Sequence, residues 1–121
     1  MDEKIIKYHI EEIKLILFIL STDLSDYDED TLILFTEAIE GRIDVLFSFD
    51  FISDLNENLK INKDITDKFE ILRRKVIKIY SKQWHEKLKK NNEDIIEIRQ
   101  LAKVILKLSD INYIEPLNYF E

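Results

Sequence analysis

The sequence predicts an all-α protein: a single-domain helical bundle of four to five helices that spans residues 1–121. The chain has one glycine and one proline, too few for the many tight turns that join the strands of a sheet. Apolar residues recur at spacings of three and four along most of the chain. The hydrophobic fraction of 45% and the charged fraction of 36% are typical of one folded domain of this length.

Two amphipathic helices are predicted in the first half of the chain. The apolar stripe of the first helix consists of Ile6, Ile10, Ile13, Leu17 and Leu20, and residues 21–23 end it. The second helix follows an acidic segment in which Asp28 or Asp30 is a candidate N-cap. Its stripe consists of Leu32, Phe35, Ile39, Ile43 and Leu46. Gly41 lies within this stripe, where it either separates two helices or lets a neighbouring helix approach closely.

The second half of the chain predicts a short helix, a long helix and a last helix. A turn near residues 47–51 precedes the short helix, which carries Ile52, Leu55 and Leu59. Asp64 is the expected cap of the long helix, whose apolar stripe continues to Leu88. Asn91 and Asn92 separate it from a helix that opens at Glu93. Pro116 marks a C-terminal tail whose aromatic and apolar side chains are expected to pack back on the bundle: Tyr113, Leu117, Tyr119 and Phe120.

Charge is segregated along the sequence, although the net charge is only −7. Residues 15–59 hold eleven acids and one base, whereas residues 60–90 hold eleven bases and four acids. Either the acidic helices lie beside the basic one and the charges partly cancel, or the acids form a surface for a basic partner. The residues predicted for this partner-binding surface are Asp26, Tyr27, Asp28, Glu29, Asp30, Glu37, Glu40 and Asp44.

Motifs for catalysis and metal binding are missing from the sequence. Asp26, Asp28, Asp30 and Glu37 fall at positions one, three, five and twelve of a calcium-binding loop, but Thr31 occupies the sixth position, where glycine is needed. A phosphate-cradling loop needs several glycines. His85-Glu86 begins like a zinc-protease helix, but Lys89 stands where the second histidine is required. We therefore expect a protein that is not an enzyme, with no cofactor and no metal site.

The basic segment 65–90 provides an alternative function. Its lysines and arginines could neutralise phosphates, and Tyr80 or Trp84 could stack on a base. These basic residues are distributed around several helix faces, and both aromatic residues fall on the apolar stripe. The second hypothesis is therefore a small helical nucleic-acid-binding regulator. The first hypothesis is a protein that binds a basic partner and makes no direct contact with nucleic acid.

The sequence predicts a cytoplasmic protein that does not insert into a membrane. No cysteine is present, so disulfides are not expected. Asp2 and Glu3 stand where a secretory signal would be basic. The longest apolar run, residues 15–20, is much shorter than the roughly 20 residues that span a bilayer.

In overall character the chain resembles bacterial toxin-immunity proteins of the contact-dependent growth inhibition or colicin kind. The shared features are a short, acidic, cysteine-free helical bundle and an acidic second helix, here Asp28 to Asp44. The Asp-x-x-Tyr-Tyr-Pro signature of the nuclease-colicin immunity proteins is absent. The resemblance implies that the protein binds a cognate nuclease toxin domain and blocks its active site or substrate groove. Aromatic candidates for anchoring such a complex are Tyr27, Phe47, Phe49 and Phe51.

Overall fold

The computed structural model describes residues 3–59 and 62–119. These residues form eight helices and no strand, which confirms the predicted all-α class. The helices are α1 Glu3–Leu20, α2 Glu29–Ile39, α3 Ile43–Leu46, α4 Phe49–Leu59, α5 Lys63–Ile79, α6 His85–Lys89, α7 Glu93–Leu108 and α8 Pro116–Tyr119. Five of them match the expected bundle, and three short helices raise the count above the predicted four to five.

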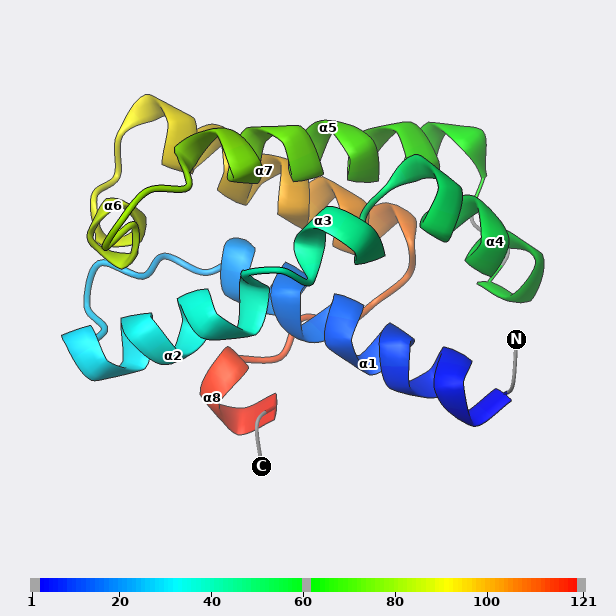
Figure 1. Ribbon diagram of the computed structural model, residues 1–121, viewed down its shortest axis with the longest axis horizontal. Helices are drawn as coiled ribbons and strands as arrows, with labels where there is room; N and C mark the ends of the chain where they lie inside the picture. The colour runs from blue at the N-terminus through cyan, green and yellow to red at the C-terminus, as the bar shows by residue number, and fades with distance from the viewer. Residues whose placement is uncertain (1–2, 60–61, 120–121) are drawn as a thin grey trace.

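The helices form two layers around one apolar core (Figure 1). α5 and α7 lie side by side in one layer, and α1 and α2 run along the other. α6 closes one end of the molecule against α2, and α4 packs on α5 towards the opposite end. α8 folds back onto α1. This arrangement places the acidic α2 beside the short basic α6.

The second half of α1 is the centre of the core, as its all-round apolar sequence predicts. Leu17, Phe18 and Ile19 are completely or almost completely buried. The helix ends where expected, because the hydroxyls of Ser21 and Thr22 donate hydrogen bonds to the carbonyl oxygen of Phe18, at 3.1 and 2.6 Å.

Gly41 separates two helices. Its φ of +74° lies in the left-handed region, which favours glycine, and it stands between the end of α2 at Ile39 and the start of α3 at Ile43. A Cβ at this position would meet nothing within 4 Å, so close approach of a neighbouring helix does not explain the glycine. The single stripe predicted from Leu32 to Leu46 is therefore divided between two helices.

The predicted long helix begins two residues earlier than expected and ends nine residues earlier. Asn62, not Asp64, is its N-cap, and the Asn62 side chain accepts a hydrogen bond from the backbone N–H of Ile65 at 2.9 Å. The helix ends at Ile79 instead of Leu88, because Tyr80 is extended and Gln83 has a φ of 61°. This break turns the chain so that α6 packs on α2 with its apolar residues inside.

α7 agrees with the expected last helix, and the expected C-terminal tail contains a further short helix, α8. Asn92 caps α7 by accepting a hydrogen bond from the backbone N–H of Ile95 at 3.0 Å. The rings of Tyr119 and Tyr113 lie 5.0 and 6.0 Å from the ring of Phe18, so both pack back on α1. Leu117, in contrast, is exposed. Phe120 and the side chain of Leu59 lie outside the described residues.

Candidate protein-binding surface

The N-terminal end of α2 is fixed by Asp28. Its carboxylate accepts a hydrogen bond from the backbone N–H of Thr31 at 2.8 Å, so one of the two predicted candidates is the cap. Hydrogen bonding from Thr31 lowers the pKa of Asp28, and the positive charge of Lys89 adds to this effect. Glu29 and Asp30 follow in the first turn, where the helix dipole favours negative charge. Asp28 is thus a structural residue of the predicted surface.

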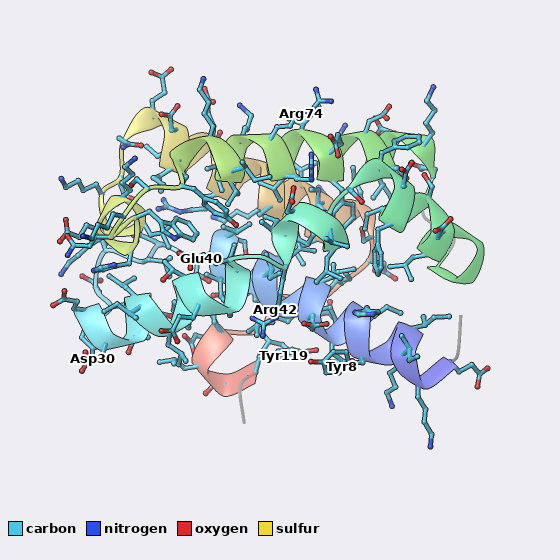
Figure 2. All side chains as sticks on the ribbon, in the orientation of Figure 1. Tyr8, Asp30, Glu40, Arg42, Arg74 and Tyr119 are labelled. Atoms are coloured by element: carbon cyan, nitrogen blue, oxygen red, sulfur yellow. The ribbon has the colours of Figure 1, made fainter. Side chains whose placement is uncertain are left out.

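Three residues form what we call the outer face of α2: Asp30, Leu34 and Glu37. They are spaced by four and three residues, so they share one side of the helix, and all three are exposed. Neither carboxylate has a hydrogen bond or an ion pair within the described part of the chain. Figure 2 shows Asp30 at the end of the molecule where α2 begins, pointing into solvent. Leu34 is 43% exposed between the two acids.

Two further acids of the predicted surface continue this negative charge near the start of α2. Asp26 is exposed and has no polar partner among the described residues. Glu29 is also exposed, and its Oε1 lies 3.5 Å from Nε2 of the buried His85 in α6. A shallow hollow of about 340 Å³ separates α2 from α6 at this point, with Leu32 and Lys89 in its lining.

The other two acids, Glu40 and Asp44, are also exposed but are bonded to side chains of the basic segment, and we call them the inner acids. Glu40 accepts a hydrogen bond from the indole N–H of Trp84. Asp44 forms an ion pair with Arg73 of α5 at 2.8 Å, and the Arg73 guanidinium also donates to the Asp44 backbone carbonyl. The inner acids therefore support the alternative in which acidic helices are partly neutralised by the basic segment.

Tyr27 is half-buried and holds the loop before α2 in place. Its hydroxyl donates a hydrogen bond to the carboxylate of Glu115, close to the start of α8, and its ring lies 5.4 Å from that of Phe35. Burial, together with the hydrogen bond to Glu115, raises the pKa of Tyr27. These contacts give Tyr27 a structural task in addition to the binding role predicted for it.

The phenylalanines proposed as anchors differ in their accessibility. Phe47 is fully buried against Phe69, with ring centroids 5.0 Å apart. Phe51 is half-buried and packs edge-on against the ring of His9 at 5.3 Å. Phe49 is exposed at the start of α4, which makes it the accessible member of the three.

Both arginines and two lysines of the basic segment form ion pairs within the protein. Arg73 and Arg74 both pair with Glu70, at 3.0 and 3.1 Å, and Lys75 pairs with Glu97 of α7 at 3.1 Å. Trp84 is only 2% exposed, so its ring lies in the core. Lysines without an ion pair in the described ranges cluster near α6, where a hollow of about 420 Å³ is lined by Lys78, Lys87 and Lys90.

Two features of the surface were missed by the sequence analysis. Leu34 lies outside the apolar stripe of its helix. Its place in the sequence therefore already indicated an apolar residue exposed to solvent. Arg42 bridges the two helices of its layer, because its Nε lies 3.0 Å from Glu12 of α1 and its Nη1 donates to two carbonyls of α2. These bonds satisfy carbonyls at the C-terminal end of α2, where a cation is favourable.

The described residues offer neither a cluster of metal ligands nor a membrane-spanning helix. In the described ranges no group of three or more histidine or acidic side chains could hold a metal ion. The positions that would form the second half of a calcium loop, Thr31 to Glu37, belong to α2. Among the described helices, none has the length and apolar character needed to cross a bilayer. No protein-family model, curated protein or solved structure matches the chain.

Proposed function

We propose that the protein is a non-enzymatic inhibitor that binds a positively charged protein partner through the outer face of α2. The partner that best fits this proposal is a nuclease toxin domain, which makes the protein an immunity protein. The observation that carries the proposal is the exposure of Asp30 and Glu37 on either side of an exposed leucine, while the inner acids of the same segment are paired.

The chemistry of such a surface suits a protein that grips phosphate backbones. Nucleases bind their substrates through clefts rich in lysine and arginine, so a negative surface can occupy or cover the cleft. Asp26, Glu29, Asp30 and Glu37 supply exposed negative charge along α2 and the loop before it. Attraction over a distance accelerates the encounter, which an inhibitor needs if it is to act before the toxin does.

Leu34 provides the apolar centre that charge alone cannot supply. Binding energy in protein interfaces is concentrated in a few desolvated residues surrounded by a polar rim. Leu34 is exposed and has an acid one helical turn away on each side. It therefore forms a small apolar centre with a charged rim. We expect Leu34 to be covered in the complex and the carboxylates to remain at the edge.

The first test is formation of a complex with the product of the adjacent gene, since immunity proteins are encoded beside their toxins. The two proteins are produced together, and a tag on this chain is used for purification at low salt. The proposal expects a stable one-to-one complex in which nuclease activity is suppressed. Absence of any complex at low salt contradicts it.

The second test locates the binding surface by charge reversal. Asp30→Lys with Glu37→Lys should slow association with that partner by about tenfold at low salt, because steering depends on the local field. The matched control is Asp50→Lys with Asp67→Lys, which changes the net charge equally at two exposed acids on α4 and α5. Equal slowing by both pairs of substitutions would show that the outer face of α2 has no special part.

A second candidate function is supported by the lysine-lined hollow near α6. Lys78, Lys87 and Lys90 converge there from two helices and a loop, an arrangement suited to phosphate groups. This candidate expects labelled duplex DNA or RNA to bind at low salt, and Lys78→Glu with Lys90→Glu to abolish binding. A gel shift without retardation at low salt would remove this candidate.

A further inference from the structure

One side of α7 is exposed, and among the described residues its ion pair with another helix joins Glu97 to Lys75 of α5. The opposite side is buried, with Ile98, Ala102 and Ile105 packed in the core between α5 and α1. The exposed side, which we call the α7 face, consists of Glu93, Ile96, Glu97, Gln100, Lys103, Val104 and Lys107. At about 100° per residue, these positions fall within about 60° of Gln100 around the helix axis.

The α7 face has a symmetrical order about Gln100. Seven residues before Gln100 stands Glu93, and seven after it stands Lys107. Ile96 and Val104, four residues away on each side, are both apolar. Three residues away the pair is Glu97 and Lys103. Every acid in the first half thus has a base at the matching place in the second half, and the apolar residue has an apolar counterpart.

This order is the one required for pairing with an identical, antiparallel helix. When two copies are related by a two-fold axis at Gln100, a residue before the axis meets the residue equally far behind it in the other copy. Glu93 then faces Lys107, and Ile96 packs on Val104. Glu97 and Lys103 lie furthest from the midline and on opposite flanks, so their long side chains approach each other only across the interface. Each contact forms twice, and the two Gln100 amides meet on the axis.

We propose that the α7 face is a self-association surface, on which a second copy of this chain docks antiparallel through the two-fold axis at Gln100. Charge complementarity selects this occupant. A parallel pair would place Glu93 on Glu93 and Lys107 on Lys107, and like charges in direct opposition are destabilising. A uniformly acidic or basic partner would match one half of the face and be repelled by the other.

The dimer is weak and separate from the proposed inhibitor surface. One helix face buries less than the roughly 1,200 Å² at which stable interfaces begin, so a dissociation constant on the order of 10–100 µM is expected. Glu97 already pairs with Lys75 of its own chain at 3.1 Å, which reduces its share in the contact. α7 and α2 belong to different layers, so dimerisation leaves the outer face of α2 accessible (Figure 1).

Sedimentation velocity of the full chain from about 10 µM to 1 mM tests self-association and its charge pairing. The unmodified chain should shift from monomer to dimer over this range. Glu93→Lys should weaken the dimer at least about tenfold, because it places two lysines together at both ends, and Glu93→Lys with Lys107→Glu should restore it. The control Asp67→Lys, at an exposed residue of α5, should leave the dimer unchanged. A chain that stays monomeric at 1 mM, or a double variant no tighter than the single one, overturns the proposal.

Cysteine crosslinking tests the antiparallel register, and the absence of native cysteine keeps the experiment clean. Gln100→Cys should form a disulfide-linked dimer under mild oxidation, whereas Ile96→Cys alone should not. A mixture of Ile96→Cys and Val104→Cys should form the mixed dimer, because these positions face each other. Self-crosslinking of Ile96→Cys at the same rate as the mixture would indicate a parallel pair and contradict the inference. All three side chains are exposed, so each variant is expected to fold, which circular dichroism verifies.

Discussion

The outer face of α2 and the inner acids differ in what their carboxylates contact, although they belong to one acidic segment. Asp30 and Glu37 point into solvent. Glu40 and Asp44, a few residues further along the chain, are bonded to Trp84 and Arg73. The difference follows from the neighbouring helices: α2 presents one side to α6 and leaves the other uncovered, and α3, which carries Asp44, packs on α5.

This comparison separates two uses of negative charge. The inner acids connect α2 and α3 to the basic second half of the chain, and their negative charge is partly neutralised by bonds within the protein. The outer acids repel each other weakly and have no partner among the described residues, so their charge remains available. Substitutions on the two sides should therefore have opposite profiles, with the larger effects on stability at the contacts of the inner acids and the larger effects on binding at the outer face.

The largest expected effect is the loss of Trp84, on the inner side. Trp84→Ala should lower the free energy of unfolding by about 3–5 kcal/mol, because it removes a large buried ring that packs on Tyr80 and bonds to Glu40. Urea unfolding followed by circular dichroism measures this loss, since Trp84 is the single tryptophan and its fluorescence disappears with it.

Two milder variants divide that loss into packing and hydrogen bonding. Trp84→Phe keeps most of the ring and removes the N–H donor, whereas Glu40→Gln keeps an acceptor for it. Both should cost clearly less than Trp84→Ala. If Glu40→Gln were as damaging as Trp84→Ala, the negative charge of Glu40 would matter more than the packing of the tryptophan.

The fold could be predicted from periodicity far better than its breaks could. The stripes of α1 and α7 are long and regular, so their apolar faces fix both helices. The break after Ile79 could not be predicted, because Val76, Ile79, Trp84 and Leu88 continue a helical pattern through it. The chain turns there for a tertiary reason, which is the contact of α6 with α2. Local spacing contains no information about such a contact.

The candidate site could be predicted as a set of acids, but its division into two sides could not. Spacing places Asp30, Leu34 and Glu37 on one side of α2, yet it does not say which neighbours the other side has. Asp44 meets Arg73 across 29 positions of sequence, and Glu40 meets Trp84 across 44. Contacts at these separations depend on how helices are arranged, which the sequence pattern does not specify.

Tyr80 gives the inner side a distinct alkaline response. Burial, followed by the negative charges of Glu40 and Asp44, raises the pKa of Tyr80 to about 12, against about 10 in the unfolded chain. Because the folded state holds this proton more tightly, the stabilisation is complete below pH 10 and is lost as the pH rises towards 12. Stability measured between pH 8 and 12 should fall less steeply for Tyr80→Phe. Identical slopes would remove Tyr80 from this effect.

The cap of α2 provides a matched pair of acids two residues apart. Asp28→Ala should cost about 1 kcal/mol, because the backbone N–H of Thr31 loses its acceptor. Asp26→Ala should cost almost nothing, since Asp26 has no partner in the described part of the chain. Thermal or urea unfolding of both variants measures the difference. Equal losses would mean that charge, and not capping, determines the contribution of this loop.

The ion pair of Asp44 with Arg73 should contribute less than the cap. Arg73 is 24% exposed and Asp44 is 58% exposed, so solvent screens their attraction. A double-mutant cycle of Asp44→Ala and Arg73→Ala should give a coupling energy of about 0.5 kcal/mol that decreases in high salt. The cycle is needed because Arg73 also bonds to Glu70 and to a backbone carbonyl. A coupling that is unaffected by salt would contradict a screened pair.

The smallest effect on stability is expected on the outer face. Asp30→Asn should cost a few tenths of a kcal/mol, because it removes a negative charge from the first turn of α2, and Glu37→Gln should gain a similar amount near the other end. The double variant should therefore unfold within about 0.5 kcal/mol of the unmodified chain. Such a small change in stability is expected for a surface that binds an external partner, because its acids contribute little to folding and repel one another. A loss above about 1 kcal/mol would give these carboxylates a structural task, and the contrast with Glu40 and Asp44 would no longer separate binding from folding.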